Sequence, residues 1–342
     1  MTTLARPGAR NLITDVPGLT VGQAEDARVR TGVSVILADR LAAAGCSVAG
    51  GGPGTRETDA LAAENLVGAV NAVVLAGGSV YGLAAADGVT TWLGARGIGF
   101  GLAPRPGAPV SPIVPAAILY DLANGGDKAW GLEPPYRALG IAAAEAAGEA
   151  FALGTIGAGY GAMAGTLKGG TGSASVVTAD GLTVGAIAAV NSFGSVVAPG
   201  GRSFWAGPYE LDGEFGGLGA AGFRAGPDDW GAAKASPQAR ANTTIACVAT
   251  DVSLTTAQAR RVAIMAQDGL ARAIRPVHGP TDGDVVFALS TGRQPMPDPV
   301  NLALTRIGAL AADCLARAIA RGVHAATAWP GSPATAWRDL AG

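Results

Sequence analysis

The sequence predicts an α/β fold in which helices and strands alternate along one continuous domain. Glycine-rich turns repeatedly separate short apolar strands from helices, which is the order typical of α/β proteins. The 342 residues are 49% hydrophobic but only 5% aromatic, so the core must consist largely of small aliphatic side chains. The chain has no internal repeat and no clear linker, and residues 1–342 are therefore expected to fold together.

Composition also excludes several classes of partner. The net charge is −2 and the 24 basic residues are spread along the chain, which argues against nucleic acid. Apolar runs are interrupted well before the roughly 20 residues that a membrane span requires. The N-terminus lacks an apolar stretch after its charges, and Cys46, Cys247 and Cys314 are widely spaced, as expected of reduced thiols. We therefore expect a cytoplasmic protein.

In the first half of the chain, strands are indicated by β-branched runs between turn residues, and helices by alanine-rich segments. The expected strands are 19–22, 32–37 and 71–76, and the expected helices are 59–66, 83–93 and 137–150. The glycine turn at 77–82 is only a weak signal for dinucleotide binding, because the Gly-x-Gly-x-x-Gly pattern and its acidic partner are missing.

The second half continues the alternation. Its expected strands are 174–177, 182–190, 243–250 and 285–289, and its expected helices are 256–274 and 302–321, the last ending at Gly322. Residues 199–241 are rich in glycine and proline and show no period. A stretch of this length inside a compact domain is either functional or tolerant of a break.

Few side chains are available for ordinary acid–base chemistry. The two histidines, His278 and His324, exclude a His-rich zinc site, and neither a metal nor a cofactor is expected. Of the three lysines, Lys168 lies among glycines in residues 165–172. A compact ammonium with a movable pKa would suit catalysis there, and a solvated loop lysine is an equal alternative.

Three separated segments, residues 77–83, 242–251 and 276–284, together resemble the self-processing L-aminopeptidase/D-esterase (DmpA-like) peptidase family. The resemblance extends from about residue 12 to about residue 322. Within the family the chain is most similar to the nylon-oligomer hydrolases, which also carry Asn-Thr-Thr, here at 242–244.

The resemblance implies a four-layer αββα sandwich of the N-terminal-nucleophile type that cuts itself between Asn242 and Thr243. The products are a large chain, 1–242, and a small chain, 243–342. The freed Thr243 then has a nucleophilic Oγ beside an α-amine. This amine titrates near pH 8 and supplies the base that a histidine-poor chain lacks.

The resemblance also implies roles for further residues. Lys168 would depress the pKa of the new amine or hold Thr243 Oγ, and Asn191 would donate to the oxyanion, unless it is a strand-end turn residue. Asp282 and Asp284 would orient the nucleophile and its amine, with a simple Asp-Gly-Asp turn as the alternative.

Two tyrosines and His278 are the remaining residues for which a role is expected. Tyr120 matches a pocket tyrosine that contacts the substrate or the oxyanion. Tyr81 lines the same pocket or packs as a strand-end aromatic. His278 is expected to make structural hydrogen bonds.

The implied activity is amide hydrolysis through an acyl-enzyme, on 6-aminohexanoate (nylon) oligomers or similar ω-amino-acid amides. The glycine-rich loop of Lys168 looks more like the aminopeptidase members, which leaves an aminopeptidase or esterase acting on short peptides, amides or esters as the alternative. A second alternative is an uncleaved binding protein without activity. The expected partner is a small-molecule substrate, and a homo-oligomer, plausibly a tetramer, is expected from the family.

Overall fold

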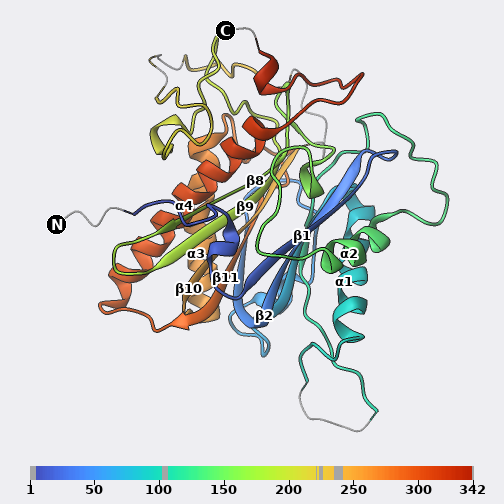
Figure 1. Cartoon of the computed structure of the whole chain (residues 1–342), viewed down its shortest axis with the longest axis vertical. Coiled ribbons are helices and arrows are strands. Elements are labelled where there is room, and N and C mark those ends of the chain that lie inside the picture. The colour runs from blue at the N-terminus through green and yellow to red at the C-terminus, as the bar shows by residue number, and fades with distance from the viewer. Residues whose placement is uncertain (1–4, 102–106, 221, 223–225, 235–241, 341–342) are drawn as a thin grey trace.

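The computed structural model describes residues 5–101, 107–220, 222, 226–234 and 242–340, and in these ranges two pairs of α-helices enclose β-sheet (Figure 1). The strands are β1 Leu19–Asp26, β2 Thr31–Val48, β3 Thr55–Arg56, β4 Ala69–Ala76, β5 Ala116–Ile118, β6 Met163–Ala164, β7 Leu167–Lys168, β8 Thr171–Val177, β9 Thr183–Asn191, β10 Thr243–Val252 and β11 Val285–Gln294. The α-helices are α1 Ala84–Gly94, α2 Tyr136–Glu145, α3 Thr256–Ala273 and α4 Val300–Ala325. No helix in the described ranges has the length and apolar character needed to span a membrane.

The 18-residue strand β2 belongs to both layers of sheet. Its first part pairs antiparallel with β1 and β4, and its last part pairs antiparallel with β11. The register with β4 shifts between Leu37 and Ala42, where the strand changes partner. One layer therefore runs β2-β11-β10-β9-β8, and the other contains β1, β2, β4, β5 and β3.

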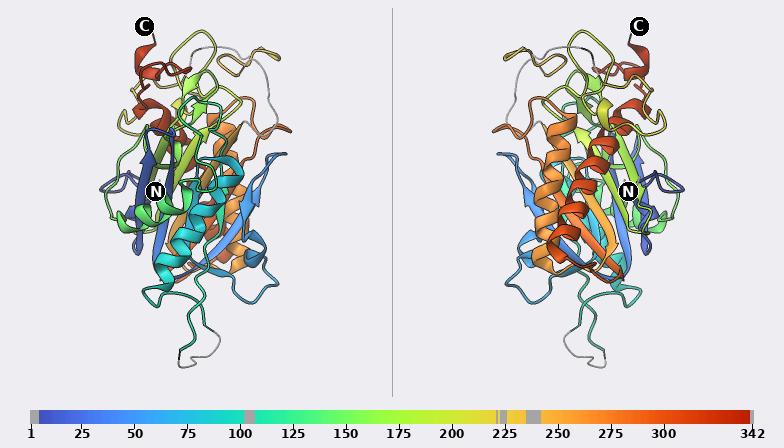
Figure 2. Two further views of the ribbon diagram at one scale, coloured as in Figure 1. Left: turned by 90° about the vertical axis from the view of Figure 1, so that its right-hand side faces the viewer. Right: turned by 90° about the vertical axis from the view of Figure 1, so that its left-hand side faces the viewer.

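The side chains form three separate core layers. Along β10, Ile245 and Cys247 belong to the cluster between the two sheets, whereas Ala246 and Val248 belong to the cluster beneath α3 and α4. A third cluster packs α1 and α2 against the outer face of β2 and β4. The two views of Figure 2 show these helix pairs on opposite sides of the sheets. The predicted αββα sandwich is confirmed.

Most predicted elements are confirmed within a few residues, and three helix predictions need correction. Residues 59–66 form only a short 3₁₀ turn, Thr58–Leu61. The helix predicted to reach residue 150 ends at Glu145, because the chain turns back and Gly148 pairs with Val21 of β1.

The third correction concerns Gly322, which lies inside α4 instead of ending it. A Cβ atom at this position would lie 2.7 Å from the backbone nitrogen of Gly172 in β8. The glycine therefore allows the helix to lie close to the strand, and this packing outweighs its low helix propensity.

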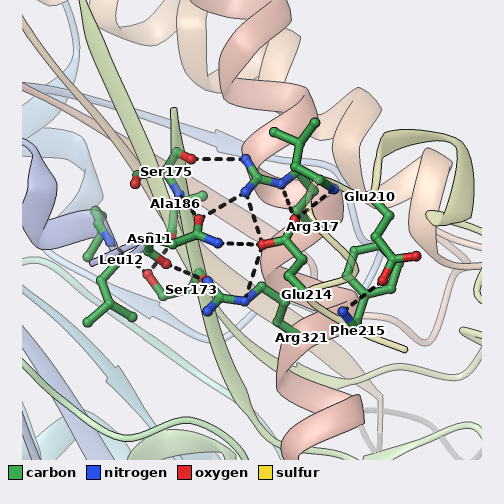
Figure 3. Close-up of polar contacts among 12 residues, drawn as sticks. Asn11, Leu12, Ser173, Ser175, Ala186, Glu210, Glu214, Phe215, Arg317 and Arg321 are labelled. Carbon is green, nitrogen blue, oxygen red and sulfur yellow. Dashed lines mark hydrogen bonds and ion pairs between the residues drawn. The ribbon is translucent and has the colours of Figure 1, made fainter. Parts of the chain in front are cut away.

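A buried polar cluster ties the irregular segment after residue 199 to the outer helix layer (Figure 3). Glu214 accepts a hydrogen bond of 3.0 Å from Arg317 Nη2 and lies 3.4 Å from Arg321 Nε. Asn11 joins Glu214 and Arg317 through its side-chain amide. Arg317 is only 1% exposed, so its charge depends on this carboxylate for compensation.

We predict that Glu214→Ala lowers the free energy of unfolding by about 3–5 kcal/mol, because it leaves buried guanidinium groups without a counter-charge. Urea unfolding in the Thr243→Ala background, which lacks the expected nucleophile, measures the effect. Glu149→Ala is the control, since this glutamate pairs with Arg10 at the surface and its loss should cost at most about 1 kcal/mol. Equal losses in the two variants would contradict the prediction.

Candidate active site

The predicted nucleophile and the predicted oxyanion donor lie directly opposite one another. Thr243 is the first residue of β10 and pairs with Asn191, the last residue of the antiparallel strand β9. Both are 2% exposed. Since side chains alternate along a strand, both follow Ile245 and Ala189 onto the face between the sheets. Paired residues of this kind have neighbouring side chains.

The carbonyl group of Asn242 receives two hydrogen bonds. Thr243 Oγ1 donates one to this oxygen, and the backbone N–H of Gly283 donates the other over 2.9 Å. Asn242 also forms a parallel β-bridge with Asp282. A hydroxyl thus lies beside a carbonyl that already accepts a hydrogen bond from a fixed backbone donor, and such a donor would stabilise negative charge developing on the oxygen during nucleophilic attack.

Gly283 must be a glycine for this arrangement. A Cβ atom on this residue would lie 2.7 Å from Thr243 Oγ1 and 2.9 Å from the carbonyl oxygen of Gly52. Because residue 283 is a glycine, its backbone N–H can lie closer to the Asn242–Thr243 bond, the junction, than it could if the residue had a side chain. From the sequence, roles were expected for the two aspartates of this turn but not for the glycine between them.

Thr243 lines a cavity of about 280 Å³ together with residues from the segments after β2 and after β4. Its other lining residues carry no charge: Gly52, Pro53, Gly54, Thr55, Ser79, Val80, Leu83 and Ile118. Tyr81 lies between two of these lining residues, and its ring packs edge-to-face on Trp130 with 5.5 Å between centroids. A contact between Tyr81 and a substrate stays a prediction.

Each of the two aspartates accepts hydrogen bonds from backbone N–H groups. Asp284 accepts a hydrogen bond of 2.7 Å from the N–H of Thr244, and its other oxygen lies 2.8 Å from Nδ1 of His278. Asp282 accepts from the N–H groups of Gly279 and Phe193. Burial, and then the charge of Asp284, raise the pKa of Asp282. His278 makes the structural hydrogen bond that was expected of it.

The side-chain amide of Asn191 is held in a defined orientation. Its Nδ2 donates to the carbonyl oxygen of Tyr120 over 3.0 Å, and its Oδ1 accepts from the N–H of Met163 over 2.9 Å. Tyr120 thus meets Asn191 through its backbone, and a contact of the Tyr120 phenol with substrate stays a prediction. The two hydrogen bonds fix which atom of the amide can face a neighbouring oxyanion.

Lys168 is fully buried in a cage of backbone oxygens. Its Nζ donates to the carbonyls of Gly159, Ala162 and Gly169 over 3.3, 3.0 and 2.8 Å, and lies 5.0 Å from the ring centre of Trp329. Burial lowers the pKa of Lys168 to about 7, although the charge of Asp121 acts in the opposite direction. These contacts in the described part of the uncut chain do not include Thr243, so the predicted role beside the nucleophile stays a prediction.

A different lysine contacts the junction. Lys234 Nζ donates to Oδ1 of Asn242 over 2.9 Å and to the carbonyl oxygen of Asn191 over 3.4 Å. Burial lowers its pKa to about 8, and the charge of Asp282 raises it. Lys234 was not predicted as a site residue from the sequence. The available signal was its rarity, as one of three lysines, together with its position eight residues before Asn242.

No group of three or more His, Cys, Asp or Glu side chains suited to a metal ion occurs among the described residues.

We predict that Lys168 makes stability depend on pH between about 7 and 10. In this window the unfolded lysine binds a proton that the folded one does not, because the folded pKa is the lower of the two. Stability from this residue therefore rises with pH, by about 1.4 kcal/mol per unit. In the Thr243→Ala background, Lys168→Met should remove this slope in urea unfolding from pH 7.5 to 9.5. Parallel curves for parent and variant would contradict the prediction.

Comparisons with known proteins agree with this geometry. The model of peptidase family S58 matches residues 11–336. An uncharacterized aminopeptidase of Mycobacterium bovis is 44% identical, with 96% of this chain and 98% of that protein covered. A 6-aminohexanoate-oligomer endohydrolase of Kocuria sp. is 28% identical over 90% of this chain and 84% of that protein.

A solved structure has the same fold. It is the L-aminopeptidase D-Ala-esterase/amidase of Ochrobactrum anthropi, described as a variant of the Ntn-hydrolase fold, with a TM-score of 0.69 and 22% identity. The alignment covers 98% of this chain and 93% of that one. The resemblance stated from the sequence is confirmed, and the chain belongs to peptidase family S58, whose members hydrolyse amide or peptide bonds.

Proposed function

We propose that the protein is a self-processing amide hydrolase whose nucleophile is Thr243, freed by cleavage of the Asn242–Thr243 bond. One observation carries the proposal. In the uncut chain the Thr243 hydroxyl donates to the carbonyl oxygen of the preceding residue, which also accepts the N–H of Gly283. A hydroxyl group and a backbone N–H donor thus meet at one peptide bond, which supports roles as nucleophile and oxyanion donor.

Self-cleavage proceeds in two steps. Thr243 Oγ1 attacks the carbonyl carbon of Asn242, and the Gly283 N–H stabilises the negative oxygen. The C–N bond then breaks, an ester links Asn242 to Thr243 Oγ1, and the hydroxyl proton goes to the released amine. Water hydrolyses the ester, giving a carboxylate at Asn242 and regenerating the Thr243 hydroxyl.

The same hydroxyl then attacks a substrate amide. The α-amine of Thr243 accepts the hydroxyl proton and passes it to the leaving amine, and water hydrolyses the acyl-enzyme. The pKa of an α-amine, near 8, suits this proton transfer at neutral pH. Asn191 and Tyr120 are the proposed oxyanion and substrate contacts, and Asp282 and Asp284 are the groups that orient the nucleophile. Lys168 either depresses the pKa of the new amine while it is protonated or, as the neutral amine that predominates above about pH 7, holds Thr243 Oγ1.

For the substrate, we favour amides and short peptides whose N-terminal residue has a small, uncharged side chain. The cavity beside Thr243 is about 280 Å³ and its lining carries no charged side chain. The aminopeptidase name belongs to the relative at 44% identity, and the 6-aminohexanoate-oligomer name to one at 28%. This difference in identity favours release of N-terminal amino acids over hydrolysis of nylon oligomers.

We also propose a cytoplasmic homo-oligomer that acts on small molecules. These properties rest on composition and on the family resemblance.

We predict that the purified protein consists of chains of 242 and 100 residues, and that Thr243→Ala stays uncut and inactive because it lacks the attacking hydroxyl. Intact-mass measurement and amide hydrolysis by the same sample test this. Thr244→Val is the matched control, since this side chain lies on the opposite face of β10 and its loss should leave cleavage intact. An active wild type that remains one 342-residue chain would refute the proposal, and cut but inactive protein would favour the binding-protein alternative.

The substrate preference gives a separate prediction. Alanine p-nitroanilide and alanine dipeptides should be hydrolysed with a kcat/KM at least about tenfold above that for linear 6-aminohexanoate oligomers. The reason is that the cavity beside Thr243 is too small to hold an extended chain. Liquid chromatography of the released amine measures both reactions under one condition. The opposite ranking would restore the nylon-hydrolase assignment.

A further inference from the structure

Lys234 lies at the junction without a role in the mechanism described so far. Its backbone N–H donates to the carbonyl oxygen of Phe193, two residues beyond the end of β9. Its side chain is partly buried, and its ammonium reaches back to Asn242 and Asn191. The residue therefore connects the end of β9 to the peptide bond that is to be cut.

In the described part of the chain, the side-chain amide of Asn242 is held by its hydrogen bond from Lys234. Asn242 is completely buried, and its Nδ2 has no hydrogen-bond partner in the described part of the chain. Its Oδ1 accepts the 2.9 Å hydrogen bond from Lys234. A hydrogen bond from a charged donor is stronger than one between neutral groups, and it is stronger still when shielded from water.

A lysine suits this position for a geometric reason. An ammonium group has three donors, and two of them are directed at Asn242 Oδ1 and the carbonyl of Asn191. Asn191 is the residue paired with Thr243, so the same cation touches both sides of the reacting strand pair. The nearby carboxylate of Asp282 favours the charged form of the lysine.

We propose that Lys234 is a positioning residue for self-cleavage, which fixes the side chain of Asn242 so that its carbonyl carbon stays within reach of Thr243 Oγ1. This inference rests on the proposed self-processing and adds a requirement that turnover does not share. Once the bond is cut, Asn242 is a chain end and no longer needs to face the nucleophile. Loss of Lys234 should therefore slow maturation far more than it slows hydrolysis of substrate by protein that has matured.

The test follows the cleavage rate of newly synthesised chain by intact mass, at pH 7 and one temperature. Lys234→Met and Asn242→Ala should each slow cleavage by about 10- to 100-fold, the effect of losing one charge-assisted hydrogen bond. The double variant should be no slower than the slower single variant, because both substitutions remove the same contact. Lys234→Arg should restore part of the rate, since it keeps a cationic donor.

Lys128→Met is the matched control. Lys128 also directs its ammonium at backbone carbonyls, those of Val29 and Gly125, but belongs to a different loop. The cleavage rate of the Lys128→Met variant should stay within about twofold of the wild-type rate. Thermal unfolding of each precursor shows whether a slow variant is folded, and if Lys234→Met is not folded, the rates of Lys234→Arg and Asn242→Ala decide the question.

The outcomes separate this inference from the function on which it rests. Wild-type cleavage rates in Lys234→Met, or a double variant slowed by the product of the two single effects, would overturn the role of Lys234 and leave self-processing intact. A wild-type chain that is never cut would overturn self-processing and this role with it. A specific slowing of maturation, with normal kcat/KM once the chain is cut, would establish it.

Discussion

The position of the junction depends on the pairing of β10 with its neighbours. On one side, the antiparallel ladder with β9 sets Thr243 opposite Asn191. On the other side, β10 runs parallel to β11, and just before that ladder begins Asn242 bridges Asp282 and accepts the N–H of Gly283. A slip of one residue would turn Thr243 towards α3 and α4, because side chains alternate along a strand. The hydrogen bonds that hold the inner layer therefore also hold the reacting groups.

Small residues make this layered arrangement possible. Gly322 of α4 faces Gly172 of β8, and a Cβ atom on Gly45 of β2 would lie 2.2 Å from the backbone nitrogen of Arg260 in α3. Helices can lie this close to strands only where one partner lacks a side chain. Much of the glycine in this chain thus serves packing between layers, in addition to the turns that the sequence pattern suggested.

The parts of the site that lie on regular strands could be predicted from the sequence, because apolar periodicity marks where β9 ends and β10 begins. The 18-residue length of β2 could not be predicted. Its middle residues, 38–41, are partly or fully exposed and interrupt the apolar run, while backbone pairing continues on either side. Lys234 escaped prediction because it follows an irregular segment without a period. Its neighbours in space, Asn242 and Asn191, are set by tertiary structure alone.

The three lysines share one use of the ammonium group. Lys128, Lys168 and Lys234 each direct Nζ at several backbone or amide oxygens in a confined space, whereas the surface ion pairs of the described chain use arginine. A small cation with three donors fits such cages more closely than a planar guanidinium does. The glycines around Lys168 allow its cage to form, because a Cβ atom on Gly169 would lie 2.0 Å from the carbonyl oxygen of Val190, and one on Gly159 would lie 2.1 Å from the carbonyl carbon of Gly170.

Lys168 and Lys234 are connected to the Asn242–Thr243 bond in different ways. Lys168 lies in β7 opposite Met163 of β6, whose backbone N–H donates to Oδ1 of Asn191. Asn191 is in turn paired with Thr243, so it connects the cage of Lys168 to the proposed nucleophile. Lys234, by contrast, donates directly to Asn242. In the proposed mechanism, Lys168 therefore acts from behind Asn191, whereas Lys234 holds the residue at which the chain is cut.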